Sequence, residues 1–155
     1  MLLQYTNGKQ FAVGAAPYES RPASNTDSSL RVALAVVIDK LPTYAMLDTG
    51  GVYLLCSPEV AASLSIDPAD GIPATPILWR GIKITGRLQR LPVTLLASEG
   101  ESLEIDATAF VPQLSSDQEG IADFPCILGL QGCLEFIRLA LDPGTDTFYF
   151  GDIAG

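Results

Sequence analysis

The chain has 155 residues, 48% of them hydrophobic and 17% charged, and its nine basic and eighteen acidic side chains give a formal net charge of −9. This hydrophobic content excludes a disordered chain, and the negative charge argues against nucleic acid or an anionic membrane as a partner. The chain contains no histidine, which excludes Ser-His and Cys-His catalysis and most zinc hydrolases.

The beginning of the chain carries no visible targeting signal. Its first ten residues, MLLQYTNGKQ, lack the basic segment and long apolar core of a signal peptide. The longest clean apolar stretch, Val32–Ile38, is far shorter than the roughly 20 residues of a membrane-spanning helix. We therefore expect a soluble, cytoplasmic protein.

Residues 1–29 are expected to form an N-terminal strand, near Phe11–Val13, followed by a loose linker. The linker, Glu19–Ser29, is polar and contains Pro22, a residue that interior strands avoid. The folded domain is then expected to span residues 30–155.

The rest of the chain alternates short apolar, β-branched runs with turn residues, which predicts strands of an all-β barrel or sandwich-like domain. The expected strands are Leu30–Lys40, Tyr44–Asp48, Val52–Cys56, Ile82–Leu88, Leu91–Ala97, Leu103–Val111, Phe136–Asp142 and Thr147–Phe150. The last two are joined by DPGTD, in which proline and glycine occupy tight-turn positions.

Two short helices are expected among these strands. In Ser57–Leu64 the serine can cap the helix, Pro58 suits the first helical position and Glu59 suits the first turn. The second helix is expected at about Gly129–Leu134.

The three cysteines are Cys56, Cys126 and Cys133, an odd number in apolar surroundings. No two of them have the spacing of metal ligands, and no histidine can complete a site. We therefore expect reduced core cysteines, and neither a metal nor another cofactor.

The stretch YAMLDTGG holds the main candidate site. An apolar run ends at Asp48, and Thr49, Gly50 and Gly51 follow. A plain strand-end turn uses the same residue types, but the glycines also let another backbone or a substrate approach closely. Much later, Phe124–Gly129 (FPCILG) again runs from apolar residues into a glycine.

Together these two motifs resemble the signature of the retropepsin-like, retroviral-type aspartic proteases: apolar-apolar-Asp-Thr-Gly, then apolar-apolar-Gly before a short helix. YAMLDTG and CILG match them, the resemblance runs over about Leu30–Phe150, and the closing segment is similar to that of bacterial members. It implies a closed acid-protease barrel with a ψ-shaped crossing around Asp48. Gly129 would leave room for the Asp48 loop, and Ile127 and Leu128 would pack under it.

The resemblance implies catalysis by two aspartates that share one proton and activate a water. Only Asp48 fits this role. In the second Asp-x-Gly, Asp142–Gly144, Pro143 lacks the hydroxyl and the N–H of threonine, and a hairpin turn is expected. The resemblance therefore implies a homodimer in which two Asp48 carboxylates meet, Gly50 supports the loop, and Thr49 braces the loop of the mate.

Family members also close the site with a flexible hairpin, the flap. Chain order places it within Asp70–Gly86, with Trp79, Arg80 and Gly81 as candidates for its substrate-facing part. Trp79 could equally be a core residue. An apolar cleft with residues such as Val52, Ile77 and Leu78 would favour hydrophobic substrate side chains.

The match departs from the family at two places. Gly51-Val52 replaces the usual Ala followed by Ser or Asp, and Leu130-Gln131 lacks the arginine that viral members use at the dimer contact. The first hypothesis is a homodimeric aspartic endopeptidase that cleaves polypeptides. The alternatives are a catalytically inactive retropepsin-fold dimer that binds peptides or serves in assembly, and a ligand-binding barrel in which Asp48 is only a turn residue.

Overall fold

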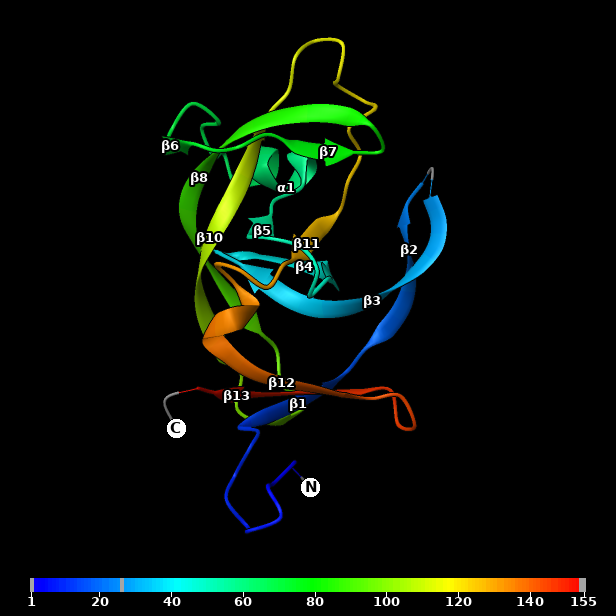
Figure 1. Ribbon diagram of the computed structural model, residues 1–155, viewed down its shortest axis with the longest axis vertical. Coiled ribbons are helices and arrows are strands. Elements are labelled where there is room, and N and C mark those ends of the chain that lie inside the picture. The colour runs from blue at the N-terminus through cyan, green and yellow to red at the C-terminus, as the bar shows by residue number, and fades with distance from the viewer. Residues whose placement is uncertain (1, 26, 154–155) are drawn as a thin grey trace.

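The computed structural model describes residues 2–25 and 27–153 (Figure 1). The strands are β1 (Gly14–Pro17), β2 (Glu19–Ser24), β3 (Asp27–Ile38), β4 (Leu41–Leu47), β5 (Leu54–Leu55), β6 (Ile72–Pro73), β7 (Ile77–Trp79), β8 (Ile82–Leu95), β9 (Glu99–Gly100), β10 (Leu103–Gln113), β11 (Cys126–Leu128), β12 (Ile137–Asp142) and β13 (Thr147–Asp152). The described residues add helix α1 (Pro58–Ser63) and a 3₁₀ turn, Leu134–Phe136.

A closed barrel forms the body of the molecule. β3, β4, β11, β5, β10 and β8 pair in that order, and β8 returns to pair with β3, with Val36 opposite Leu95 and Ile38 opposite Val93. Because side chains alternate along a strand, these four residues all point inward, and each is at most 1% exposed.

The chain crosses itself around β11. This strand lies between β4 and β5, parallel to β4 and antiparallel to β5. Since β4 and β5 are joined by the loop that contains Asp48, the chain wraps around β11 in the predicted ψ-shaped crossing. The predicted fold class, an all-β acid-protease barrel with few short helices, is confirmed.

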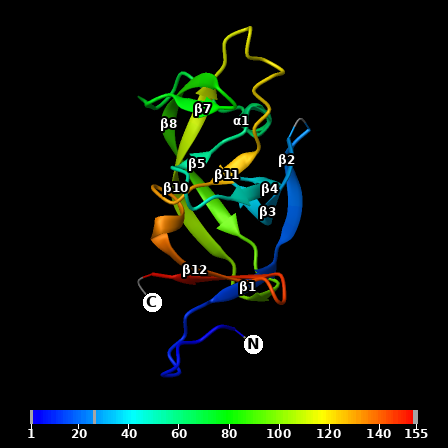
Figure 2. The ribbon, with the colours of Figure 1, turned by 45° about the vertical axis from the view of Figure 1, so that its right-hand side comes forward.

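A second sheet closes one end of the barrel. Its strand order is β12-β13-β1-β9, and it lies at the end opposite to β7 in both views (Figures 1 and 2). β1 pairs with β13, with Gly14 opposite Phe150. Phe148 and Phe150 are each 1% exposed and join the barrel core.

The expected loose linker over residues 19–29 is wrong. Residues 19–24 form β2 and residues 27–29 begin β3, and the two strands pair antiparallel, with Arg21 opposite Arg31. Pro22 is compatible with this strand because β2 is the last strand of its sheet, where an N–H is not needed on the outer side. The N-terminal strand also lies later than Phe11–Val13, at β1. Residues 1, 26, 154 and 155 of the two predicted segments lie outside the described residues.

Two further expectations need correction. The two strands expected over Ile82–Leu88 and Leu91–Ala97 are one continuous strand, β8, which curves through Pro92. The second helix is reduced to the turn Leu134–Phe136, because Gly132 has a φ of 79°, which no α-helix contains. The first helix is confirmed: the Ser57 hydroxyl accepts the Val60 N–H at 3.1 Å.

None of the helices in the described ranges is long and apolar enough to cross a membrane.

Candidate active site

Asp48 follows directly on β4, and a strand from far along the chain holds its backbone. The Asp48 N–H donates to the Leu128 carbonyl at 3.0 Å, and the Gly51 N–H donates to the Asp48 carbonyl at 3.0 Å. The exposed carboxylate is oriented locally, because the Gly50 N–H donates to its Oδ1 at 3.0 Å. The loop therefore presents a carboxylate to the surface on a backbone that is anchored to β11.

Gly129 makes the crossing possible. A Cβ atom at this position would lie 2.7 Å from the Tyr53 carbonyl oxygen and 2.8 Å from the Gly51 carbonyl carbon. The Gly129 N–H donates to the Tyr53 carbonyl and the Leu130 N–H to the Gly51 carbonyl, both at 2.8 Å. The Asp48 loop thus lies directly against Gly129, and no larger residue fits there unless the backbone moves.

The other two residues of the second motif face opposite sides of β11. Leu128 is fully buried in the barrel core. Ile127 is half-buried and packs against a second hydrophobic cluster, made up of Leu55, Ile84, Phe110, Ala122 and Phe124. The structure therefore brings Ile127, Leu128 and Gly129 together with the Asp48 loop.

Three residues lie at the surface, on the Asp48 loop or beside it: Thr49, Val52 and Leu130. Thr49 is exposed, and its hydroxyl makes no hydrogen bond within residues 2–25 and 27–153. Val52 and Leu130 are 46% and 44% exposed, and Val52 forms a bridge with Gln131. The carboxylate therefore has exposed apolar neighbours in its own chain.

The flap candidates form the end of a tight hairpin. Trp79 of β7 lies opposite Ile82 of β8, and Arg80 and Gly81 between them have φ angles of 51° and 79°. Positive φ at both central residues defines a type I′ turn, which matches the twist of the flanking strands. Arg80 and Gly81 are thus the tip of the hairpin, and the motif Arg-Gly between apolar runs was the available sequence signal.

The end of the hairpin is attached to the rest of the molecule by an apolar and by a polar contact. The Trp79 ring packs edge-on against Phe124, with centroids 5.7 Å apart, so Trp79 is half-buried against the second cluster. Arg80 reaches the β2–β3 hairpin, with Nη2 2.9 Å from Ser24 Oγ and 3.4 Å from Asp27 Oδ2. The pKa of Asp27 lies below its ordinary value, chiefly because Ser29 donates its hydroxyl and its N–H to this carboxylate, with Arg80 adding to the effect.

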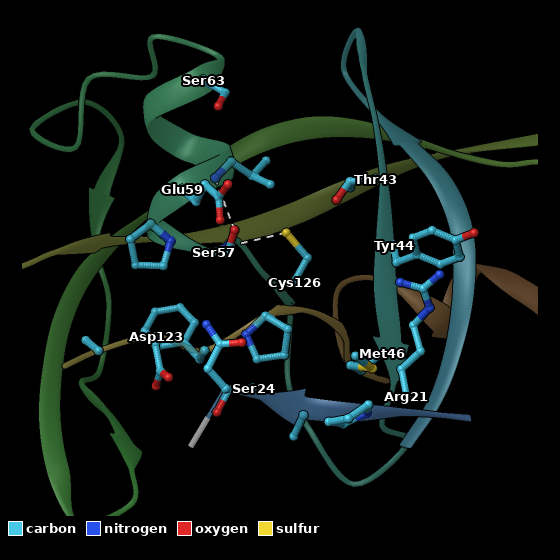
Figure 3. A pocket seen from close by; sticks show the side chains of 18 of the residues that line it. Arg21, Ser24, Thr43, Tyr44, Met46, Ser57, Glu59, Ser63, Asp123 and Cys126 are labelled. Carbon is cyan, nitrogen blue, oxygen red and sulfur yellow. Dashed lines mark hydrogen bonds between the residues drawn. The ribbon is translucent and has the colours of Figure 1, made fainter. Parts of the chain in front are cut away.

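A cavity of about 1080 Å³ lies beside β4 and is separate from the Asp48 loop (Figure 3). Its walls are β2, β4, the start of α1 and the segment before β11. Arg21 stacks on Tyr44, with the guanidinium 3.6 Å from the ring centroid, while Asp48 is not part of the lining. The sequence pattern missed this cavity because one of its walls, β2, was interpreted as a linker.

The described part of the chain holds no group of three or more His, Cys, Asp and Glu side chains arranged to bind a metal ion.

No family model and no curated protein sequence matches the chain. Its structure is similar to the crystal structure of a retropepsin-like aspartic protease from Rickettsia conorii, with a TM-score of 0.54 and 17% sequence identity. The likeness covers 90% of this chain and 94% of that one. At this identity the likeness establishes a retropepsin-like fold.

Proposed function

We propose that the chain is an aspartic endopeptidase that acts as a homodimer, with one Asp48 from each copy in the active site. The observation that carries this proposal is the Asp48 carboxylate itself, exposed at the surface and anchored to β11 in a retropepsin-like barrel. One chain offers one such carboxylate, and a two-fold axis supplies the second.

The chemistry needs no metal and no histidine. Two carboxylates about 3 Å apart cannot both ionise, so the pair holds one proton. The ionised carboxylate takes a proton from a water, whose oxygen attacks the peptide carbonyl, while the protonated one donates a hydrogen bond to the carbonyl oxygen. The C–N bond then breaks as the amine receives a proton from the pair, and the two carboxylates again share one proton.

Each residue of the loop has a distinct part in this proposal. The Gly50 N–H holds Oδ1 of Asp48 at 3.0 Å, which leaves Oδ2 for the mate or the water. The exposed Thr49 hydroxyl braces the loop of the mate. The contact of Gly129 with the loop backbone keeps the carboxylate at a defined position, which proton transfer from a water requires.

The β7–β8 hairpin serves as the flap in this proposal. Its tip, Arg80 and Gly81, is tied to the β2–β3 hairpin through Ser24 and Asp27. Leu78 is 75% exposed and offers an apolar surface to a substrate. The expected substrates are extended or unfolded polypeptides with hydrophobic side chains near the cleaved bond.

Cleavage of an unfolded protein, assayed from acidic to neutral pH, tests the proposal. Asp48→Asn should reduce the rate at least roughly 100-fold, because it removes the proton-transferring group. Asp142→Asn is the matched control, since Asp142 sits in the second Asp-x-Gly loop and also accepts a glycine N–H, at 2.9 Å. Cleavage by the Asp48→Asn variant at the wild-type rate would contradict the proposal.

A second candidate is an inactive dimer of the same fold that binds peptides. Val52 favours it, because it stands where active family members usually have a polar side chain. Sedimentation of the protein with a transition-state peptide analogue separates the two candidates. A dimer that binds the analogue but never cleaves any unfolded protein supports the second, whereas turnover that falls faster than the protein concentration on dilution supports the first.

A further inference from the structure

Two of the three cysteines face each other inside the ψ crossing. β11 runs antiparallel to β5, with Ile127 opposite Leu55. One residue further along the same register, Cys126 lies opposite Cys56. The two residues come from segments far apart in the sequence, and only the crossing makes them neighbours.

The backbone hydrogen-bond pattern shows which kind of pair position Cys56 and Cys126 occupy in the antiparallel ladder. The Gly129 N–H donates to the Tyr53 carbonyl, so this pair is hydrogen-bonded, and such positions alternate along an antiparallel ladder. Cys126 and Cys56 therefore fall at a position without hydrogen bonds, and the Cys56 N–H indeed points away, to the Phe110 carbonyl of β10. At such positions Cα atoms lie about 4.5 Å apart, within the roughly 4.4–6.8 Å of disulfides.

The side chains of this pair point to the same side. Cys56 and Cys126 are 0% and 2% exposed, both in the barrel core, and their thiols influence each other's ionisation. The Cys56 thiol donates to the Ser57 carbonyl, with the sulfur 3.7 Å from the oxygen. The Ser57 N–H also donates to the Cys126 sulfur at 3.4 Å. Cys126 belongs to the lining of the cavity beside β4, where Figure 3 shows its sulfur next to Ser57. A small reagent in that cavity therefore meets Cys126 first.

We propose that Cys56 and Cys126 are a reactive thiol pair that a peroxide converts into a disulfide, which links β5 to β11 across the ψ crossing. This site is independent of the proposed peptidase activity. Cys133 takes no part in it.

The electrostatics make Cys126 the nucleophile. The neighbouring Cys56 thiol lowers the pKa of Cys126, against the effect of burial, and the Ser57 N–H lowers it further. The proximity of Cys126 and burial both raise the pKa of Cys56. For Cys133, burial alone raises the pKa to about 12. The Cys126 thiol thus ionises first, and the thiolate is the form that reacts.

The reaction balances in two steps. The Cys126 thiolate attacks hydrogen peroxide, so that an S–O bond forms, the O–O bond breaks, and the departing hydroxide takes up the proton that the Cys126 thiol released. The Cys56 sulfur then attacks the Cys126 sulfur. The S–S bond forms, the S–O bond breaks, and the hydroxyl leaves as water with the proton of the Cys56 thiol. Two thiols are oxidised, and the peroxide is reduced to water.

The test counts thiols in the folded protein after treatment with hydrogen peroxide. Wild type and Cys133→Ala should both lose two thiols and the mass of two hydrogens, and peptide mapping should join the Cys56 and Cys126 peptides. Cys56→Ala and Cys126→Ala should show no such mass loss. Because the bond closes a long loop between positions that are already opposite each other on neighbouring strands, the melting temperature should rise by roughly 5 °C or more and return on reduction.

Two results would overturn the inference. One is a disulfide that includes Cys133, or that joins two copies of the chain. The other is a folded wild-type protein that keeps all its thiols under conditions in which the unfolded chain forms disulfides. Wild type and Cys133→Ala decide the question even if the variants of the pair fold poorly. The assay does not use proteolysis, so its outcome is separate from that of the Asp48 test.

Discussion

The chain contains two Asp-x-Gly loops, and their local structures are nearly the same. Each lies at the end of a strand: Asp48 follows β4, and Asp142 is the last residue of β12. In each, the aspartate Oδ1 accepts the N–H of the glycine, Gly50 at 3.0 Å and Gly144 at 2.9 Å. The hydrogen-bonded turn is therefore common to both loops and cannot be what distinguishes a candidate active site.

The difference lies in what holds each loop. Asp48 donates its N–H to Leu128 of a distant strand, and Gly129 packs against the loop. Asp142 accepts a hydrogen bond from the nearby Thr145 hydroxyl at 3.1 Å, and its turn simply joins β12 to β13. The comparison teaches that a long-range crossing, rather than turn chemistry, holds a carboxylate at a defined place on the barrel.

The largest expected effect is the loss of cleavage in Asp48→Asn, and we expect that making the second loop resemble the first does not reverse it. Pro143→Thr creates a second Asp-Thr-Gly, and in an Asp48→Asn background we expect no recovery, so that the rate stays at least roughly 100-fold below wild type. The reason is that, in the described part of the chain, the Asp142 turn only joins β12 to β13, and no strand crosses beneath it. The assay is cleavage of an unfolded protein, and recovered cleavage would show that turn chemistry alone suffices.

Gly129, which packs against the Asp48 loop, and Gly144, which lies in the Asp142 loop, should differ strongly in their tolerance of alanine. A Cβ atom at Gly129 would meet backbone atoms at 2.7 Å, whereas at Gly144 it would meet only the movable Asp142 carboxylate, at 3.1 Å. Gly129→Ala should lower the free energy of unfolding by about 3 kcal/mol, and Gly144→Ala by less than about 1 kcal/mol. Urea unfolding measures both, and equal losses would remove the claimed asymmetry.

Removal of the Thr145 hydroxyl should affect the stability of the single chain, whereas removal of the Thr49 hydroxyl should affect the proposed dimer. The Thr145 hydroxyl donates to Asp142 Oδ2 at 3.1 Å and also lies 2.9 Å from the Thr147 hydroxyl oxygen, so Thr145→Val should lower the free energy of unfolding by about 0.5–1 kcal/mol. The exposed Thr49 is proposed to bond to the mate, so Thr49→Val should instead weaken the dimer about tenfold. Analytical ultracentrifugation measures the dissociation constant. If Thr49→Val leaves that constant at its wild-type value, the proposed brace is wrong.

The smallest expected effect concerns the β7–β8 hairpin, which is proposed to serve as a flap over the Asp48 loop and not over the Asp142 loop. The lowered pKa of Asp27 keeps this carboxylate ionised at neutral pH and also at pH values somewhat below its ordinary pKa. The link to Arg80 is therefore lost only as the pH falls through the lowered pKa. Asp27→Asn should imitate that loss at neutral pH. Trypsin should then cut after Arg80 roughly two- to fivefold faster.

The matched control for the flap is another pair at the surface. Arg90 and Asp106 are 2.8 Å apart and well exposed, so Asp106→Asn removes a similar ion pair on β8 and β10. It should leave cleavage after Arg80 unchanged. An equal acceleration in both variants would point to general loosening rather than to a link at the hairpin tip.

The features that the sequence predicted correctly are carried by short motifs. Ser57 with Pro58 identifies α1, and the crossing that brings the Asp48 loop to Gly129 follows from two motifs and the family they resemble. The prediction of a linker over Glu19–Ser24 was wrong because β2 is mostly exposed and polar, so no apolar alternation marks it as a strand. The contact between Cys56 and Cys126 was also not predictable, since it depends on the register of two strands that are distant in sequence.

The pairing of β1 with β13 has a practical consequence for engineering. Gly14 lies opposite Phe150, so the first and last strands of the folded body are antiparallel neighbours. Two copies could therefore be expressed as one tandem polypeptide with a flexible tether leaving the end of one body and entering the start of the next. In such a fusion each copy of Asp48 can be replaced separately, which would turn the proposed symmetric pair into two individually addressable positions.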